Sequence, residues 1–199
     1  MGTDIHAYID VAYVAEINKK PHGKGVDSFA AVHIGRDYEL FNCLAGVRSD
    51  DDDSSLAVVK PRGLPKELGF ITEAAFYLYI REDGEEAESG ERSCLREQAK
   101  RWVKNGSSHW CDSTKNQVSD PDAHSMSWAT LEELIEVQEN YTNELSHPNC
   151  DLAAIIGAMQ ALKRTEKDVD CYYDKTQNKD IEVERITTYE PRLVYWFDN

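Results

Sequence analysis

The chain has 199 residues and a formal net charge of −15, with 37 acidic against 22 basic side chains and 41% hydrophobic residues. A chain of this length and hydrophobicity can bury its own core and is typical of globular proteins. The acidic balance disfavours sequence-independent binding to nucleic acid or to an anionic membrane, because both require clustered Lys and Arg. We therefore expect neither as a partner.

The five cysteines are odd in number and form no CxxC pair. This usage predicts neither a zinc ribbon nor a redox motif. No apolar run near the first residue marks a signal peptide or a membrane anchor, so we expect reduced thiols and a cytoplasmic location.

Strict alternation of apolar and polar residues opens the chain. The odd positions of DIHAYIDVAYVAEI form one apolar face, which predicts a strand over 4–17 with Asp4, His6 and Tyr8 on the opposite face. The segment 19–25, KKPHGKG, is typical of a loop.

Helices are predicted where apolar residues recur with a period of 3.6. They are expected over 36–48, over 93–106, from Thr130 onward and over 151–164. Thr130 and Glu133 form a capping box, and Gly46 can end the first helix.

The remaining patterns predict strands and acidic loops. Strands are expected over 70–80, 181–189 and 191–199, and the last is apolar on both faces, which favours a central place in the sheet. The charge run at 50–53 predicts a solvated loop, and the acidic stretch 81–91 predicts a loop or an insertion.

No internal repeat or interdomain linker interrupts this pattern. The elements together predict a single α+β domain over 1–199, with a mostly antiparallel sheet and helices packed on one side. We expect the N- and C-terminal strands near the centre of the sheet.

Five pieces of the chain are shared with a known group of proteins: MGTDIHAYID, RDYELFNCLAGVR, RGLP, DPDAHSMSWATLEEL and VYWFDN. In this order they cover about a quarter of the chain, and they resemble small bacteriophage and prophage proteins that begin Met-Gly-x-Asp-Ile-His-x-Tyr and carry Asp-x-His-Ser-x-Ser-Trp. Many of those proteins have Cys where this chain has Thr3, so a thiol role there is not carried over. The resemblance implies a phage or prophage gene, expressed in the cytoplasm of an infected bacterium.

The pattern Asp-x-His occurs twice, first with Asp4 and His6 and again with Asp122 and His124. If the loop 120–128 crosses the polar face of the first strand, the four side chains converge. Such a set suits a divalent metal ion, or acid–base chemistry on a phosphate ester. The alternative is that each pair only satisfies loop backbone groups, with an Asx turn at Asp122.

The convergence predicts where a ligand pocket would lie. We expect His6 within direct or one-water reach of Asp122, His124 or Ser125, and we expect these residues to line the main pocket with Arg48. We predict no bound metal and no cofactor.

Several residues near these motifs are suited to a nucleotide. Arginine forks recognise phosphates and aromatic faces stack on bases. The candidates are Arg36, Arg48, Arg62, Trp128 and Tyr8. Each has an ordinary alternative, since Arg36 can pair with Asp37 at a helix end and Trp128 can belong to the core.

Three functions remain open at this stage. The first is a phage protein that sequesters a small nucleotide-like molecule, such as a host immune signal, without being an enzyme. The second is a metal-dependent hydrolase that acts on such a molecule through the two Asp-x-His pairs. The third is an acidic inhibitor of another protein, or a DNA mimic, supported by the charge alone. The sequence leaves homo-oligomerisation open.

Overall fold

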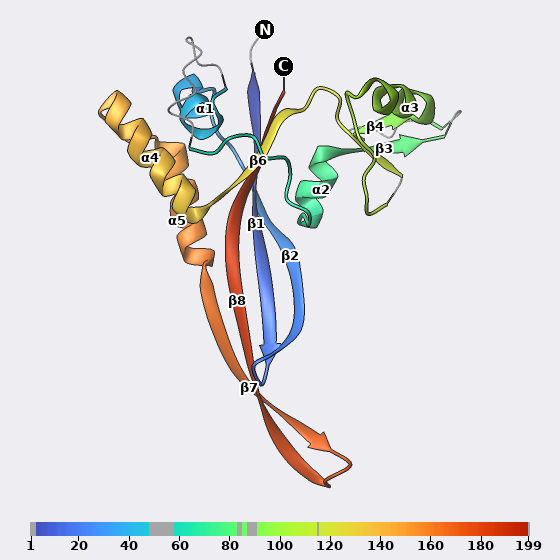
Figure 1. Cartoon of the computed structure of the whole chain (residues 1–199), viewed down its shortest axis with the longest axis vertical. Coiled ribbons are helices and arrows are strands. Elements are labelled where there is room, and N and C mark those ends of the chain that lie inside the picture. Colours follow the sequence, from blue (N-terminus) through green and yellow to red (C-terminus); the bar gives the residue numbers. More distant parts are fainter. Residues whose placement is uncertain (1–2, 48–57, 83–84, 87–90, 115, 199) are drawn as a thin grey trace.

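The computed structural model describes residues 3–47, 58–82, 85–86, 91–114 and 116–198. Its centre is a long, twisted sheet whose strands run from a broad head into a narrower part of the molecule (Figure 1). Helices lie on one side of the head, and a smaller unit of helices and strands lies on the other side. In the described ranges, no helix is both long enough and apolar enough to cross a membrane.

The main sheet has five antiparallel strands in the order β2-β1-β8-β6, with β7 also paired to β8. The strands are β1 Asp4–Ile17, β2 Lys20–Val32, β6 His124–Thr130, β7 Arg164–Asp174 and β8 Lys179–Asp198. The α+β class is confirmed, and the N- and C-terminal strands lie side by side in the middle of the sheet. The single-domain prediction stays a prediction.

One face of the sheet forms the main core. The odd residues of β1 up to Val11 are buried, together with Leu193, Tyr195 and Phe197 of β8. The helices α1 Tyr38–Ala45, α4 Leu131–Leu145 and α5 Cys150–Leu162 supply the other half of this core. Beyond Val11, β1 continues into the narrower part of the molecule, where its residues are only partly buried or exposed.

Local signals set the helix ends as expected. Asp37 accepts a hydrogen bond from the backbone N of Leu40 at the start of α1, and Gly46 ends α1 in the left-handed region at φ 66°. The capping box of Thr130 and Glu133 starts α4. These contacts satisfy backbone groups that a helix end leaves unpaired.

A second unit, here called the small lobe, packs against the other face of the main sheet (Figure 1). It consists of α2 Phe70–Phe76, β3 Tyr77–Arg81, β4 Ser93–Leu95, α3 Arg96–Asn105 and β5 Gln117–Ser119. Its strands pair in the order β4-β3-β5 and bury a core of their own. Helices α1, α4 and α5 thus cover one side of the sheet, and α2 lies on the other.

Two local predictions are wrong. Of the strand expected over 70–80, only the part from Tyr77 onward is a strand, and 70–76 is a helix whose buried residues Thr72 and Phe76 lie one helical turn apart. The predicted loop 19–25 continues as β2, since Asn18 and Lys19 alone make the turn, with φ 49° and 62°. Two consecutive residues of positive φ form the type I′ turn that suits a tight hairpin.

The two predicted C-terminal strands are a single strand, β8. Its neighbour on one side changes at Pro191: β7 pairs as far as Tyr189, and β6 pairs from Arg192 onward. A proline cannot donate a backbone hydrogen bond, and neither β6 nor β7 pairs with Pro191. The acidic stretch 81–91 lies partly outside the described residues, and its described part beyond Arg81 belongs to no helix or strand.

A buried carboxylate joins the small lobe to the main sheet. Asp10 of β1 is fully buried and accepts hydrogen bonds from the backbone N of Gly69 (2.8 Å) and the hydroxyl of Thr72 (2.5 Å). The hydroxyl of Ser28 donates a third bond at 3.3 Å, and a guanidinium nitrogen of Arg192 lies 4.0 Å away. Three strands and the start of α2 therefore meet at one side chain.

Replacing Asp10 by Ala should lower the free energy of unfolding by about 3 kcal/mol, because it leaves buried donors without an acceptor. Urea denaturation measures the change. Asp27→Ala, which removes an exposed carboxylate from the neighbouring strand, is the matched control and should have little effect. Gly69→Ala should be comparably harmful, since a Cβ there would collide with the Ser28 backbone. Equal stability of the Asp10→Ala and Asp27→Ala proteins would contradict the assignment.

Candidate functional site

The polar face of β1 carries an aromatic stack. His6 pairs across the sheet with Trp196 of β8. The Trp196 ring lies nearly parallel to the rings of both His6 (centroids 5.5 Å, 16°) and Tyr8 (5.3 Å, 9°). Phe76 of α2 meets Trp196 edge-on at 5.1 Å, so the small lobe holds the stack in place.

Charged groups border this stack. The His6 Nε2 atom lies 2.8 Å from the Asp198 carboxylate. Because an ionised carboxylate only accepts hydrogen bonds, this contact places a proton on Nε2 and leaves Nδ1 as an acceptor in the neutral ring. Asp4 pairs through both carboxylate oxygens with Arg36, and the donated hydrogen bond holds the pKa of the Asp4 carboxyl below its usual value.

The stack lines a cavity of about 340 Å³ between the main sheet and the small lobe. Besides His6, Tyr8, Trp196 and Asp198, its wall includes Arg92 and Asp120. Arg92 and Asp120 form an ion pair at 2.5 Å. Burial raises the pKa of the Tyr8 hydroxyl, and the positive charge of Arg92 partly offsets that effect.

Two further cavities continue from this one along the junction of the main sheet and the small lobe. A cavity of about 460 Å³ shares Asp120 and Ala123 with it and is also lined by His109, His124 and Ser125. A third cavity, of about 680 Å³, shares His109 with the second. The three cavities are thus connected in series through shared lining residues, and the cavity with the aromatic stack is the first of the series.

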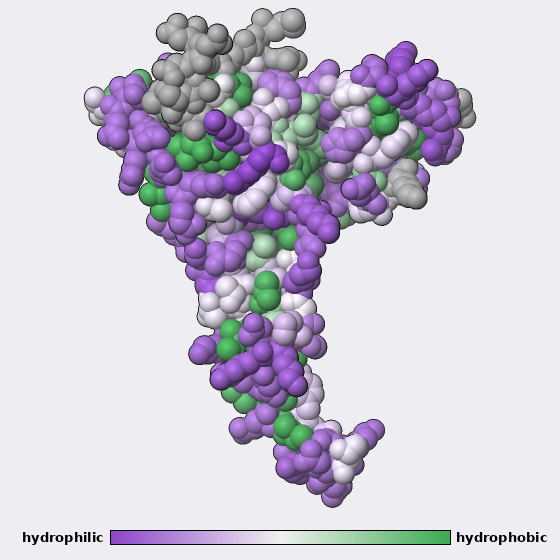
Figure 2. Space-filling model, in the orientation of Figure 1, coloured by the Kyte–Doolittle hydropathy of each residue, from purple (hydrophilic) through white to green (hydrophobic). Residues whose placement is uncertain are grey.

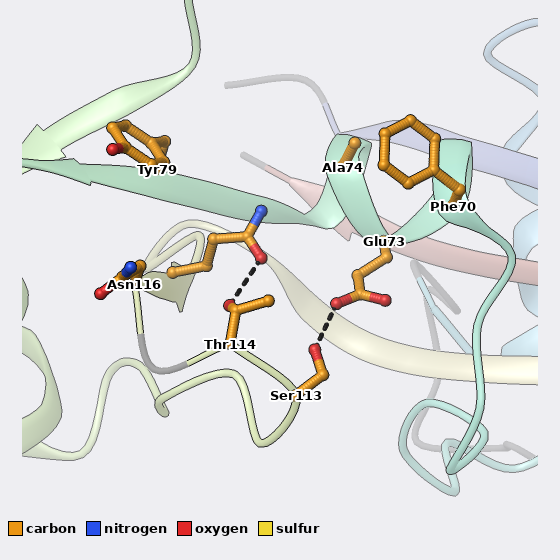
Figure 3. A pocket seen from close by; sticks show the side chains of 8 residues that line it. Phe70, Glu73, Ala74, Tyr79, Ser113, Thr114 and Asn116 are labelled. Atoms are coloured by element: carbon orange, nitrogen blue, oxygen red, sulfur yellow. Dashed lines mark hydrogen bonds between the residues drawn. The ribbon is translucent and has the colours of Figure 1, made fainter.

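The small lobe carries an apolar cavity of about 480 Å³, which shares Glu73 and Ser113 with the third cavity (Figure 3). Phe70 and Tyr79 stand at its two sides, and the Glu73 carboxylate accepts a hydrogen bond from Ser113 at 2.6 Å. No arginine or lysine is among its described lining residues. It is therefore poorly suited to a phosphate.

The two Asp-x-His pairs do not converge as expected. The His6 ring stacks on Trp196, and the His124 ring stacks on Phe197 at 6.1 Å. The two imidazoles therefore stack on different residues of β8, and they line different cavities. The described residues contain no group of three or more His, Cys, Asp or Glu side chains that could hold a metal ion.

The loop 120–128 still reaches the His6 cavity, but through Asp120 and Ala123 in place of the expected residues. Asp122 is exposed, and its backbone N bonds to the Asp120 carboxylate at 3.1 Å. Ser125 adopts φ 50° at the bulge of β6, with its hydroxyl 3.1 Å from His124 Nδ1.

The expected arginine and tryptophan ligands lie elsewhere. The guanidinium of Arg62 stacks 3.8 Å above the Trp128 ring and pairs with both oxygens of Glu133. These contacts fasten the loop that follows Pro61 to the start of α4. Arg36 is engaged by Asp4, and Arg48 lies outside the described residues.

Sequence reasoning did not select Trp196, Asp198, Arg92 and Asp120. The usable signal was the alternation of VYWFDN, which places Trp196 and Asp198 on one face of the last strand. That face meets His6 only through the register of β8 on β1, which the sequence does not state.

Asp198→Asn should release His6 from the Nε2-protonated tautomer, because an amide can either donate or accept at that position. Nitrogen-15 NMR of the His6 ring at alkaline pH measures the proportion of the two tautomers. Asp4→Asn is the matched control and should leave the ring in its original tautomer. An unchanged spectrum in the Asp198→Asn protein would show that Asp198 does not orient His6.

Comparison of the chain with protein-family models, with curated proteins and with solved structures found no match. A function for this site is therefore inferred from its own side chains.

Proposed function

We propose that the chain binds a small nucleotide-like ligand in the cavity lined by the aromatic stack. The observation that carries this proposal is the ordered set His6, Trp196 and Tyr8 at the wall of a cavity that also contains an arginine. Flat, rigid aromatic side chains suit a nucleobase, since ring stacking favours parallel or offset planes.

Size and polarity support this ligand class. A cavity of about 340 Å³ lies at the lower end of the range for small-molecule sites. The carboxylates of Asp120 and Asp198 can accept hydrogen bonds from the amino group of a base. Arg92 can donate to a phosphate or a base carbonyl, in exchange for part of its ion pair with Asp120.

Binding is favoured over cleavage by the placement of the Asp-x-His pairs. The hydrolase alternative required Asp4, His6, Asp122 and His124 around one reacting group. His6 and His124 stack on different residues of β8 and line different cavities, and Arg36 already engages Asp4. The resemblance to phage and prophage proteins suggests a host immune signal as the ligand and sequestration in the host cytoplasm as the role.

The test is to incubate the purified protein with a panel of nucleotide signals, denature it by heat and analyse the supernatant. Intact nucleotide, depleted before heating and recovered afterwards, supports sequestration. A cleaved product would replace binding by hydrolysis. Failure to deplete any nucleotide of the panel would overturn the proposal.

Variants locate the site within the same assay. His6→Ala and Arg92→Ala should each weaken binding about tenfold or more, because each removes a ring contact or a charge-assisted hydrogen bond. Their melting temperatures should stay close to that of the unchanged protein. Arg96→Ala, which removes an exposed arginine paired with Glu82 in the same lobe, is the matched control. Equal binding by all three variants would place the ligand elsewhere. Arg48→Ala then tests the candidate arginine that lies outside the described residues.

A further inference from the structure

The β7–β8 hairpin extends beyond the rest of the protein. The last residue of β1, Ile17, pairs with Arg185, and Asn18 bonds to the backbone oxygen of Glu184. Past that point β7 and β8 pair only with each other among the described residues. The segment 169–184, here called the arm, forms the lower end of the molecule (Figure 1).

The arm exposes apolar side chains with no layer packed on them. Val169 is 66% exposed, Tyr173 57% and Tyr172 49%. Figure 2 shows hydrophobic patches between hydrophilic ones along this narrow part of the molecule. An isolated two-stranded hairpin is marginally stable in water, so a hairpin of this kind gains much from a partner.

The two faces of the hairpin differ in how their charges are satisfied. On one face, Asp170 forms an ion pair with Arg185 at 2.6 Å. The Tyr172 hydroxyl lies between them, accepting from Arg185 at 3.3 Å and donating to Asp170 at 3.4 Å. The charged groups of this face are therefore already paired with each other.

The opposite face, here called the arm face, places acidic side chains of β8 beside apolar side chains of β7. Its cross-strand pairs are Val169 with Glu184, Cys171 with Glu182 and Tyr173 with Asp180. Within the described residues, no cation pairs with any of these three carboxylates. A column of exposed apolar side chains therefore lies directly beside a column of uncompensated acidic ones.

We infer that the arm face binds a basic, partly apolar segment of another protein. The acidic column requires a basic partner, and the apolar column favours one that also carries hydrophobic side chains. The outer edge of β7 has no proline and no bulge, so its backbone groups can pair with an added strand.

A second copy of the chain fits this face less well. The arm holds five carboxylates against two lysines, and the whole chain carries −15. Two arm faces brought together would oppose carboxylates to carboxylates, which is destabilising. The arm lies at the far end of the strands from the ligand cavity, so this inference is independent of the proposed function.

The experiment selects binders from immobilised, randomised peptides about ten residues long, the length of a typical long strand. The full-length protein is the bait. We expect the selected peptides to combine Lys or Arg with apolar residues. Their affinity, measured by fluorescence anisotropy, should fall about tenfold or more in the Glu182→Lys/Glu184→Lys protein, which reverses two charges of the arm face.

Glu136→Lys/Glu139→Lys is the matched control, since it changes the net charge equally on the exposed face of α4. The selected peptides should bind this control as they bind the unchanged protein. Selection of acidic or purely apolar peptides, or an equal loss in both variants, would overturn the inference. Sedimentation that reveals a dimer dispersed by Glu182→Lys/Glu184→Lys would assign the arm face to a second copy and also overturn it.

Discussion

The arrangement of the molecule depends on one buried carboxylate. Asp10 accepts from the backbone N of Gly69 and from Thr72, so the beginning of α2 is held against the polar face of β1. A carboxylate this deeply buried is tolerated only when several donors surround it. Its position also brings Phe76, one turn after Thr72, to the edge of Trp196. The small lobe is thereby placed over a face that would otherwise be polar and open.

This placement explains why the cavities lie where they do. The apolar face of the main sheet packs against helices α1, α4 and α5 and forms the main core. The opposite face carries His6, Tyr8 and charged groups, against which the small lobe packs only in part. Burying these polar side chains under apolar ones would leave their hydrogen-bonding groups without partners, which costs free energy. The junction of the two units therefore keeps cavities that solvent can enter. The site is a consequence of joining two units across a polar surface.

The strand β8 connects the cavity lined by the aromatic stack with the arm. Its C-terminal half lies between β1 and β6 and supplies Trp196 and Asp198. Its N-terminal half pairs with β7, and at Pro191 one neighbour replaces the other. A single continuous strand therefore borders a cavity at one end and forms an exposed surface at the other. The cavity is lined by side chains that can form further hydrogen bonds. On the arm, three carboxylates form no ion pair with any described residue.

The sequence by itself determined the features that depend on neighbours a few residues apart. The alternation in β1, the capping box of Thr130 and the glycine end of α1 all lie where the pattern predicts. Only the tertiary structure decided which faces meet. His6 lies on Trp196, 190 positions along the chain, and away from His124, because the strand registers set those neighbours. Register results from packing and pairing summed over the whole sheet, and no short motif encodes that sum.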